Sequence, residues 1–243
     1  MKSALKAGLS ALVVGVIVVV GAAVYFMQDD RSSMPTVTQT GQSGKALIGG
    51  PFELVDGSGR TVTDKDFRGK CLLVFFGFTH CPDVCPITLQ ILAGTAGRLA
   101  AHASDGPGDA PADAASTPEV VFVSVDPHRD TPAAIRRYLD GFDPSFTGAT
   151  GSDAALAPLL KALGVTVQKH DHQGERYNVV HNGTVYFIGP RGEWIALSSP
   201  PHDPAVLAAD FLAVRASYLR TFGADALETT ASDGEEARTA AAR

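Results

Sequence analysis

Two continuous apolar runs dominate the hydrophobic pattern of the chain. They occupy residues 71–78 and 120–125, and neither shows the alternation of apolar and polar positions that marks a half-exposed strand. Runs of this kind are typical of central strands in an α/β sheet, where helices cover both faces. Each run is followed by a loop and then by apolar residues at helical spacing. The pattern therefore predicts two β-α units.

Four stretches carry apolar residues at the spacing of a helix with one buried face. They begin near Pro86, Thr131, Ser152 and Asp203, which are residue types that suit the first positions of a helix. Gly164 follows the third stretch, at a place where glycine commonly ends a helix. We expect helices over about residues 86–99, 132–142, 152–163 and 204–219.

Two hairpins complete the predicted elements. Residues 52–63 read as two short strands with a turn at Asp56 and Gly57, and residues 179–189 and 193–197 read as paired strands around a Pro-Arg-Gly turn. The predicted order is hairpin, β, α, β, α, α, β, β, α. This order indicates an α/β protein with a thioredoxin-like fold, in which helices flank a central mixed sheet.

The N-terminal segment has the composition of a transmembrane anchor. After Lys2 and Lys6, the uncharged run from Ala7 to Met27 is long enough to cross a bilayer, which takes about 20 residues. A cleaved signal peptide is the alternative, although its apolar region is usually shorter. The lysines before the run place the rest of the chain outside the cytoplasm by the positive-inside rule. We expect a single-pass inner-membrane protein with its domain on the periplasmic side.

Composition then divides the remaining chain. Residues 28–47 are rich in Ser, Thr, Gln and Gly and are predicted to form a flexible stalk, whereas the last residues carry no apolar stripe. The predicted organisation is an anchor at 1–27, a stalk at 28–47, a thioredoxin-like domain at 48–220 and a disordered or frayed tail at 221–243. The net charge of -6, without a cluster of Lys and Arg, argues against nucleic acid as a partner.

The chemistry of the chain is concentrated in a CxxxC motif where the first central strand runs into its helix. Cys85 lies at the positive end of that helix, so we expect its thiol to ionise more readily than a free cysteine. Cys81 and Cys85 are four residues apart and can converge on one point, either as a disulfide or around one soft metal ion. Because the chain has three cysteines, no disulfide framework supports the fold. A structural disulfide or a pair of buried thiols is the alternative.

Four segments of the chain resemble the SCO/SenC family of membrane-anchored copper chaperones that serve cytochrome oxidase assembly. They are FFGFTHCPDVCP at 75–86, SVDPHRDTP at 124–132, YNVVHN at 177–182 and YFIGPRG at 186–192. The resemblance implies that the thioredoxin-like domain binds one copper ion, as Cu(I) or Cu(II), through Cys81, Cys85 and His181. This sequence departs from the family pattern at Val180 and Gly189, where many members have Asp. The departure affects the groups expected to orient the imidazole of His181.

The resemblance also implies a function. A membrane-anchored chaperone would deliver copper to the copper A site of cytochrome c oxidase subunit II, with a thiol reductant or another copper donor as a further partner. The alternative is a thiol-disulfide oxidoreductase, or a peroxiredoxin-like peroxidase, acting through the same redox-active pair Cys81 and Cys85. His181 discriminates between these hypotheses, because sulfur chemistry does not require it and a three-coordinate copper site does.

Other polar residues near the motifs have simpler interpretations. His80 is expected to pack in its loop rather than bind metal, and His170 and His172 to lie in a solvated loop, with accessory copper capture as their alternative role. Asp83 suits a turn between the cysteines, and the alternative is that its carboxylate tunes the charge of the thiolates or docks a partner. Asp126 and Asp130 follow the second central strand, either at the edge of the site or as helix-start residues. Cys71 is expected to be a core thiol.

Overall fold

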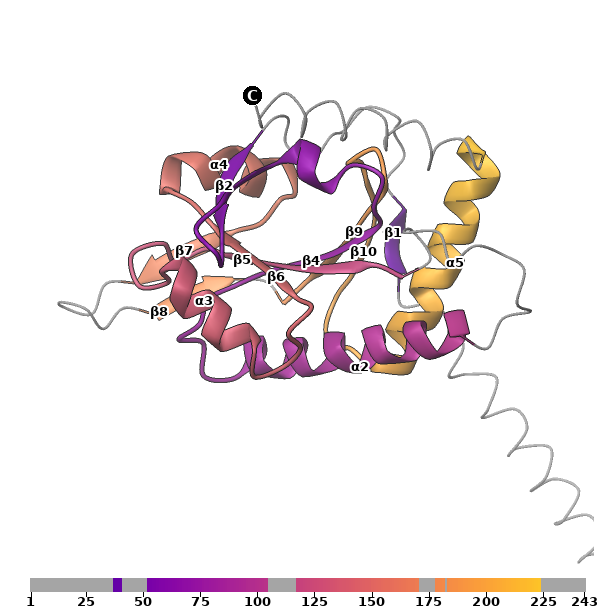
Figure 1. Ribbon diagram of the computed structural model, residues 1–243, viewed down its shortest axis with the longest axis horizontal. Helices are drawn as coiled ribbons and strands as arrows, with labels where there is room; N and C mark the ends of the chain where they lie inside the picture. Colours follow the sequence, from indigo (N-terminus) through magenta and orange to yellow (C-terminus); the bar gives the residue numbers. More distant parts are fainter. Residues whose placement is uncertain (1–36, 41–51, 105–116, 171–177, 182, 224–243) are drawn as a thin grey trace, which may run out of the picture. The chain divides into compact units, whose positions relative to one another are not determined.

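The computed structural model describes residues 37–40, 52–104, 117–170, 178–181 and 183–223, with backbone alone for 37–40, 169–170 and 178–181. In this part of the chain an eight-stranded sheet has the order β1-β10-β9-β4-β5-β6-β2-β3, and a separate two-stranded sheet pairs β7 with β8. Figure 1 shows α2 and α4 on opposite sides of the larger sheet. The predicted α/β fold, a mixed sheet flanked by helices, is confirmed.

The elements follow one another closely along the described chain. The strands are β1 (Val37–Thr40), β2 (Glu53–Asp56), β3 (Thr61–Thr63), β4 (Leu72–Gly77), β5 (Glu119–Ser124), β6 (Thr147–Thr150), β7 (Val167–His170), β8 (Asn178–His181), β9 (Val185–Ile188) and β10 (Trp194–Ser198). The helices are α2 (Val84–Ser104), α3 (Pro132–Leu139), α4 (Asp153–Ala162) and α5 (Pro204–Phe222), with a 3-10 turn at Asp64–Phe67.

The centre of the sheet defines the edge where the CxxxC motif lies. Strands β4 and β5 are parallel, with Gly77 opposite Ser124, and β5 and β6 are also parallel. Strand β9 is antiparallel to β4, with Val185 opposite Phe75. The carboxyl ends of β4 and β5 therefore meet the beginning of β9, at the kind of edge where ligands gather in α/β sheets.

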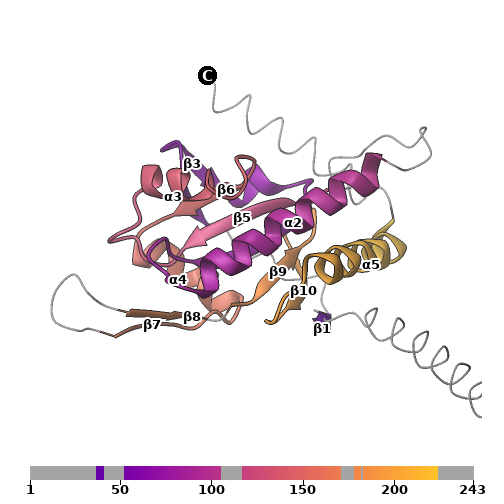
Figure 2. The ribbon, with the colours of Figure 1, turned by 90° about the horizontal axis from the view of Figure 1, so that it is seen from below.

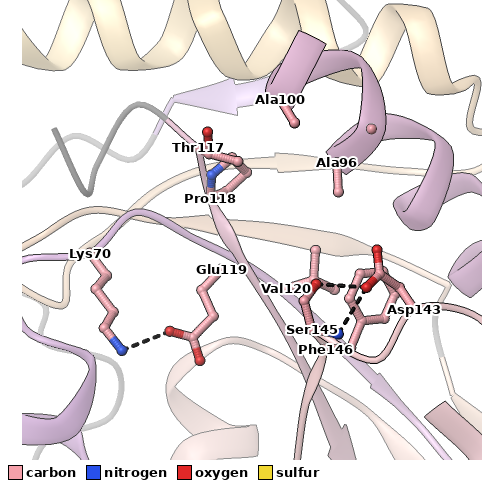
Figure 3. Close-up of a pocket in the computed structure, with 11 residues that line it drawn as sticks. Lys70, Ala96, Ala100, Thr117, Pro118, Glu119, Val120, Asp143, Ser145 and Phe146 are labelled. Atoms are coloured by element: carbon pink, nitrogen blue, oxygen red, sulfur yellow. Dashed lines mark hydrogen bonds and ion pairs between the residues drawn. The ribbon is translucent and has the colours of Figure 1, made fainter. Parts of the chain in front are cut away.

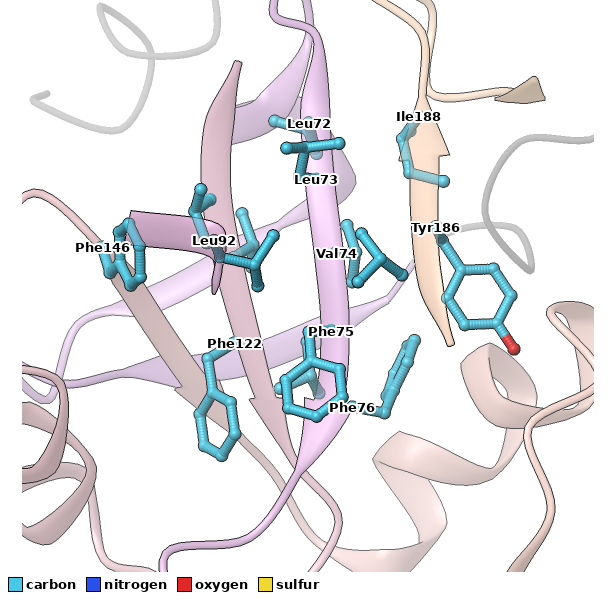
Figure 4. Close-up of a cluster of buried hydrophobic side chains, with 14 of the residues drawn as sticks. Leu72, Leu73, Val74, Phe75, Phe76, Leu92, Phe122, Phe146, Tyr186 and Ile188 are labelled. Carbon is cyan, nitrogen blue, oxygen red and sulfur yellow. The ribbon is translucent and has the colours of Figure 1, made fainter. Parts of the chain in front are cut away.

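Alternation along β4 divides its side chains between two apolar layers. Leu72 and Val74 line an apolar cluster with Phe67 and with Leu159 of α4, on one face of the sheet. Phe75 and Gly77 belong to the other face, towards α2. Both faces are fully covered, so β4 is buried at every position, as a continuous apolar run predicts. Figure 4 shows buried apolar side chains of β4 beside Tyr186 and Ile188 of β9.

The helix starts follow the residue types that the sequence offers. The Thr131 hydroxyl accepts a hydrogen bond from Ala134 N, and Ser152 does the same for Ala155 N. Asp203 Oδ1 accepts from the amides of Ala205 and Val206. Such caps contribute about 0.5–2 kcal/mol each. The predicted N-termini of α3, α4 and α5 are confirmed.

The structure corrects the predicted strands in three places. Residues 179–189 do not form one strand, because β8 ends at His181 and pairs with β7, whereas β9 begins at Val185. Figure 2 shows this β7-β8 hairpin apart from the main sheet. Strands β6 and β7 were not predicted: the TGAT sequence of β6 carries little hydrophobic signal, and His170, which was expected to lie in a solvated loop, is the last residue of β7. The third correction is at Val37–Thr40, predicted as flexible stalk, which forms β1 and pairs with β10.

The predicted anchor (1–27), most of the stalk (28–47) and the tail beyond residue 223 lie outside the described residues. Within the described ones, one helix, α2, is long and apolar enough to cross a membrane by length and composition. Its Leu89, Leu92 and Leu99 are buried in the core, and it packs against α5. A core helix of a folded domain meets the same criteria, so α2 does not bear on the anchor at 1–27.

Gly148 of β6 offers a test of this packing. A Cβ atom at that position would overlap Ile135 of α3 and lie 2.7 Å from Leu139 Cδ1. Gly148→Ala is therefore expected to lower the free energy of unfolding by about 1–3 kcal/mol, the usual cost of overpacking. Gly97→Ala is the control, because a Cβ there meets nothing within 4 Å, and alanine favours a helix by about 1 kcal/mol. Equal effects in urea denaturation would contradict the α3-β6 contact.

Candidate functional site

The CxxxC motif lies at the first turn of α2, and the helix begins earlier than the sequence predicted. The Ile87 amide donates to Asp83 O at 3.3 Å, so the helix starts at Val84 and Pro86 is its third residue. Proline is tolerated there because the first amides of a helix have no partner within it. The Cys85 amide instead donates to Cys81 Sγ at 3.4 Å. The sulfur of Cys81 thus caps the helix.

The two cysteines occupy different environments. Cys85 is 0% exposed, whereas Cys81 is half-buried. A hydrogen bond with Cys81 and then burial raise the pKa of Cys85 well above its usual range. The sequence prediction that Cys85 ionises readily is therefore wrong. The helix amide that would stabilise a thiolate points at Cys81, and Cys85 lies in the core, where a charge is costly.

Gly77 permits the close approach of Cys85 to the sheet. A Cβ atom on Gly77 would lie 2.9 Å from Cys85 Sγ and 2.7 Å from the Phe122 ring. Real Cβ atoms do not approach so closely, so any other residue would push the first turn of α2 away from β4. The last residue of the central strand thus fixes the depth at which Cys85 is buried.

A buried carboxylate holds the loop that leads to Cys81. Asp130 is 0% exposed, and its oxygens accept hydrogen bonds from the Thr79 amide at 2.8 Å, the Thr79 hydroxyl at 2.6 Å and the Ser124 hydroxyl at 2.6 Å. His80 Nδ1 lies 3.5 Å from the same carboxylate, and its side chain is 57% exposed. A buried charge with several donors is stable and rigid. Asp130 therefore acts on the loop before Cys81, while Thr131 caps α3.

Asp126 supports the neighbouring loop. It is also 0% exposed, and its carboxylate accepts from Arg129 Nε at 2.5 Å. The Arg129 guanidinium lies over the Phe78 ring, 5.7 Å from the ring centre. Phe78 is the first residue after β4, so this ion pair braces the connection between the central strand and the CxxxC motif. Both aspartates thus lie at the edge of the site, as expected, and both serve its architecture.

His181 lies two residues before a buried glycine, Gly183, that packs against the motif. It is the last residue of β8, opposite Val167 of β7. Two residues further on, a Cβ atom on Gly183 would lie 3.1 Å from Val84 Cγ1 and 3.0 Å from Pro200 Cγ. The chain that follows His181 is therefore packed against the helix residue between the two cysteines. The side chain of His181, and those of His170 and His172, lie outside the described part of the structure.

His202 is a residue of this edge that the sequence reasoning missed. Its Nε2 is 2.8 Å from Gly183 O, and its Nδ1 is 3.2 Å from the Ser198 hydroxyl. In the sequence, His202 precedes a helix start and matches no motif, so no local signal marks it. Its importance arises from the β9-β10 pairing, which places Ser198 opposite Val185.

Gly189 lies at the opposite end of the sheet from the motif. Because β9 is antiparallel to β4, Ile188 lies opposite Leu72, at the beginning of the central strand. Gly189 follows it and packs near Glu193 and Tyr218. Gly189 is therefore placed away from the CxxxC motif, and its effect on the orientation of His181 stays a prediction. Cys71 begins the same end of β4 and is 3% exposed, which confirms it as a core thiol.

A pocket of about 510 Å³ also lies at this far end, between α2 and the beginning of β5 (Figure 3). Its polar wall contains Lys70 and Glu119, which form an ion pair at 2.8 Å, and its apolar wall includes Ala96 and Ala100. It contains no thiol or imidazole. Among the side chains that the structure describes, no group of three or more His, Cys, Asp and Glu residues could hold a metal ion. The three-ligand set with His181 thus stays a prediction.

Comparisons with known proteins agree on one family. The SCO1/SenC family model matches residues 40–215. The mitochondrial SCO1 homolog of Homo sapiens is 37% identical over 156 residues, which cover 63% of this chain and 48% of that protein. SCO1 homolog 1 of Arabidopsis thaliana is 32% identical over 177 residues, 73% of this chain and 50% of that protein. The chain spans about half the length of these relatives.

Solved structures give the same result. The crystal structure of Arabidopsis thaliana ScoI with copper bound has a TM-score of 0.62 and 31% identity, covering 70% of this chain and 99% of that chain. Bradyrhizobium japonicum ScoI with copper bound has a TM-score of 0.58 and 34% identity, covering 69% and 99%. These similarities confirm the predicted thioredoxin-like fold.

The unequal burial of the cysteines predicts unequal reactivity. In the reduced, metal-free protein, iodoacetamide should modify Cys81 much faster than Cys85, because the reagent cannot reach a fully buried sulfur without local opening. The rates can be measured by mass spectrometry on Cys71→Ala/Cys85→Ser and Cys71→Ala/Cys81→Ser, each of which retains one motif cysteine. Addition of urea is the control that should equalise them. Equal rates in buffer would show that Cys85 is not shielded in solution.

Proposed function

The chain belongs to the SCO1/SenC family, and on this premise we propose that it is a copper chaperone. It binds one copper ion through Cys81, Cys85 and His181 and delivers the ion to the copper A site of cytochrome c oxidase subunit II. The observation that carries this proposal is the packing of the chain after His181 against the start of α2, where the CxxxC motif lies. The contact between Gly183 and Val84 brings the chain after His181 to the turn that holds both cysteines.

The donor set suits copper in both oxidation states. Two thiolates favour Cu(I), and an imidazole nitrogen is a good ligand for Cu(I) and Cu(II). Cys81 and Cys85 are already hydrogen-bonded to each other through their sulfurs, so one ion can reach both with little rearrangement. Because copper binds thiolates, loading releases the proton that Cys85 holds tightly. Copper affinity should therefore fall as the pH is lowered.

The unequal exposure of the two sulfurs gives copper transfer a direction. Cys81 is half-buried at the surface, so a partner's ligand reaches the metal on its side. Cys85 holds the ion from below and is anchored by the packing against Gly77. Exchange with an acceptor therefore starts at the exposed side and releases Cys85 last. When a donor loads the site, the steps run in reverse: Cys85 binds the ion first, and Cys81 then displaces the last ligand of the donor.

A membrane location completes the proposal. Residues 1–27 anchor the chain in the inner membrane, the segment between the anchor and β1 supplies reach, and the domain faces the periplasm, where oxidase subunit II presents its copper site. Support comes from the lysines before the uncharged run and from the length of that run.

Protease accessibility tests this topology. With the full chain expressed in a Gram-negative host, protease added to intact spheroplasts should degrade the domain, because it faces outwards. A cytoplasmic marker protein, which should survive, is the control for intact cells. Protection of the domain would contradict the anchored topology. A soluble mature chain that begins after the small residues Gly21-Ala22-Ala23, where a signal peptide would be cleaved, would contradict it too.

A second candidate function is thiol-disulfide exchange with the cysteines of the acceptor. The half-buried Cys81 is placed to attack, and the buried Cys85 beside it is placed to resolve a mixed disulfide. The same pair could serve a peroxidase, but neither reaction needs His181. Copper binding does.

His181→Ala separates these functions. The variant should lose Cu(II) affinity by more than the roughly 10–100-fold typical of losing an outer-shell partner, because Cu(II) favours nitrogen, while Cu(I) persists on the two sulfurs. Competition titration and Cu(II) spectra measure this. The Cys81-Cys85 disulfide potential should be unchanged, and cells should fail to load oxidase with copper.

His80→Ala is the matched control, since His80 is adjacent to Cys81 and 57% exposed. It should bind Cu(II) as the wild type does. Wild-type Cu(II) binding and oxidase assembly in His181→Ala would eliminate His181 as a ligand and favour the reductase function.

A further inference from the structure

The His202 ring has both nitrogens engaged, and their partners fix its tautomer. A carbonyl oxygen can only accept, so Nε2 must donate its proton to Gly183 O at 2.8 Å. Nδ1 of the neutral ring is then an acceptor and receives the Ser198 hydroxyl at 3.2 Å. The imidazole thus links the chain before β9 to the end of β10. A ring held at both nitrogens is not available as a metal ligand.

Gly183 is confined on its other sides. A Cβ atom there would lie 3.0 Å from Pro200 Cγ and 3.1 Å from Val84 Cγ1, and the residue is buried. The hydrogen bond from His202 therefore acts on a backbone that already packs against the first residue of α2. Val84 lies directly before Cys85. The position of Gly183 relative to the cysteines is set by this three-sided enclosure.

His202 itself is anchored to the same helix. The next residue, Asp203, caps α5 through the amides of Ala205 and Val206. Pro204 then lies against α2, where a Cβ atom on Gly94 would be 3.2 Å from Pro204 Cβ. The chain that carries His202 is thus fixed to α2 at Gly94, further along the helix than Val84. Both His202 and Cys85 are held by one rigid element, and Gly183 lies between them.

We propose that His202 is a positioning residue for copper: it holds Gly183, and through it the end of β8 with His181, at the distance from Cys81 and Cys85 that a shared ion requires. This inference rests on the proposed copper function. Only one residue stands between His181 and Gly183 in the sequence, so we expect a shift of Gly183 to change the position of the His181 backbone. Without the hydrogen bond, binding of copper must also fix the position of the end of β8, and this entropic cost lowers the affinity for copper.

The expected effect is selective for the nitrogen ligand. Loss of a group that orients a metal ligand typically costs about 10–100-fold in metal affinity. His202→Ala should therefore weaken Cu(II) binding by that range and alter the nitrogen signature in the Cu(II) spectrum, with a much smaller effect on Cu(I) held by two sulfurs. The Cys81-Cys85 disulfide potential should not change, because β4 and α2 hold both sulfurs without His202.

The test compares four variants of the full chain. His202→Gln keeps an N-H donor near the position of Nε2 and should restore most of the Cu(II) affinity lost in His202→Ala. His128→Ala is the matched control, because His128 follows β5 at the same edge but contacts Asp153 at 3.2 Å, and it should behave as wild type. His181→Ala supplies the reference for complete loss of the imidazole.

Hydrogen-deuterium exchange of the metal-free protein gives a readout that does not involve copper. The amides of residues 183–185 should exchange faster in His202→Ala than in wild type and return towards wild type in His202→Gln. A purely structural role would instead raise exchange throughout the domain and shift the disulfide potential. That result would overturn the proposal.

The outcomes separate the two levels of the hypothesis. Cu(II) loss in His181→Ala together with wild-type affinity in His202→Ala overturns the positioning role and leaves the chaperone function standing. Wild-type Cu(II) affinity in His181→Ala overturns the proposed function and this inference with it. Weakened Cu(II) binding in both, with an unchanged disulfide potential and rescue by glutamine, supports both.

Discussion

The close approach of Cys85 to the end of β4 is the constraint on which the site depends. Gly77 has no side chain, so Cys85 Sγ can lie where a Cβ atom would be 2.9 Å away. This contact fixes the depth and direction of α2 as it leaves the sheet. Cys81 can then cap the helix with its sulfur, and Val84 can reach Gly183. The cap and the contact with Gly183 both depend on the position of this first turn.

A buried carboxylate completes the frame from the side of β5. Removing Asp130 from water costs energy, but three hydrogen bonds from Thr79 and Ser124 compensate for it. The charge has a second effect on the site. The hydrogen bond with Cys81 and burial are the main causes of the raised pKa of Cys85, and the negative charge of Asp130 adds to them. The same residue therefore orders the loop and makes a minor contribution to the raised pKa of the buried thiol.

Much of this architecture was predictable, for reasons that also explain the failures. The continuous apolar run of β4 and the caps at Thr131, Ser152 and Asp203 are local signals, and the structure confirms them. Strand β6 carries no such signal, because neighbouring strands and α3 supply its burial. The state of Cys85 was mispredicted because the helix dipole is readable in the sequence, whereas the depth of the sulfur depends on a glycine of another element. His202 was missed for the same reason: its partners come from β9 and β10.

The two proposed chemistries share the sulfurs, but they depend on different parts of the fold. Disulfide exchange needs Cys81 and Cys85 alone, and both are held by β4, α2 and the loop that Asp130 orders. Copper binding by the proposed set also needs an imidazole carried by the β7-β8 hairpin, which stands apart from the main sheet and is tied to α2 through Gly183 and its neighbours. Changes at the ends of β9 and β10 should therefore affect metal binding and spare the thiols, whereas changes at the β4-α2 junction affect both. A protein of this construction can adjust its affinity for copper without altering its redox pair.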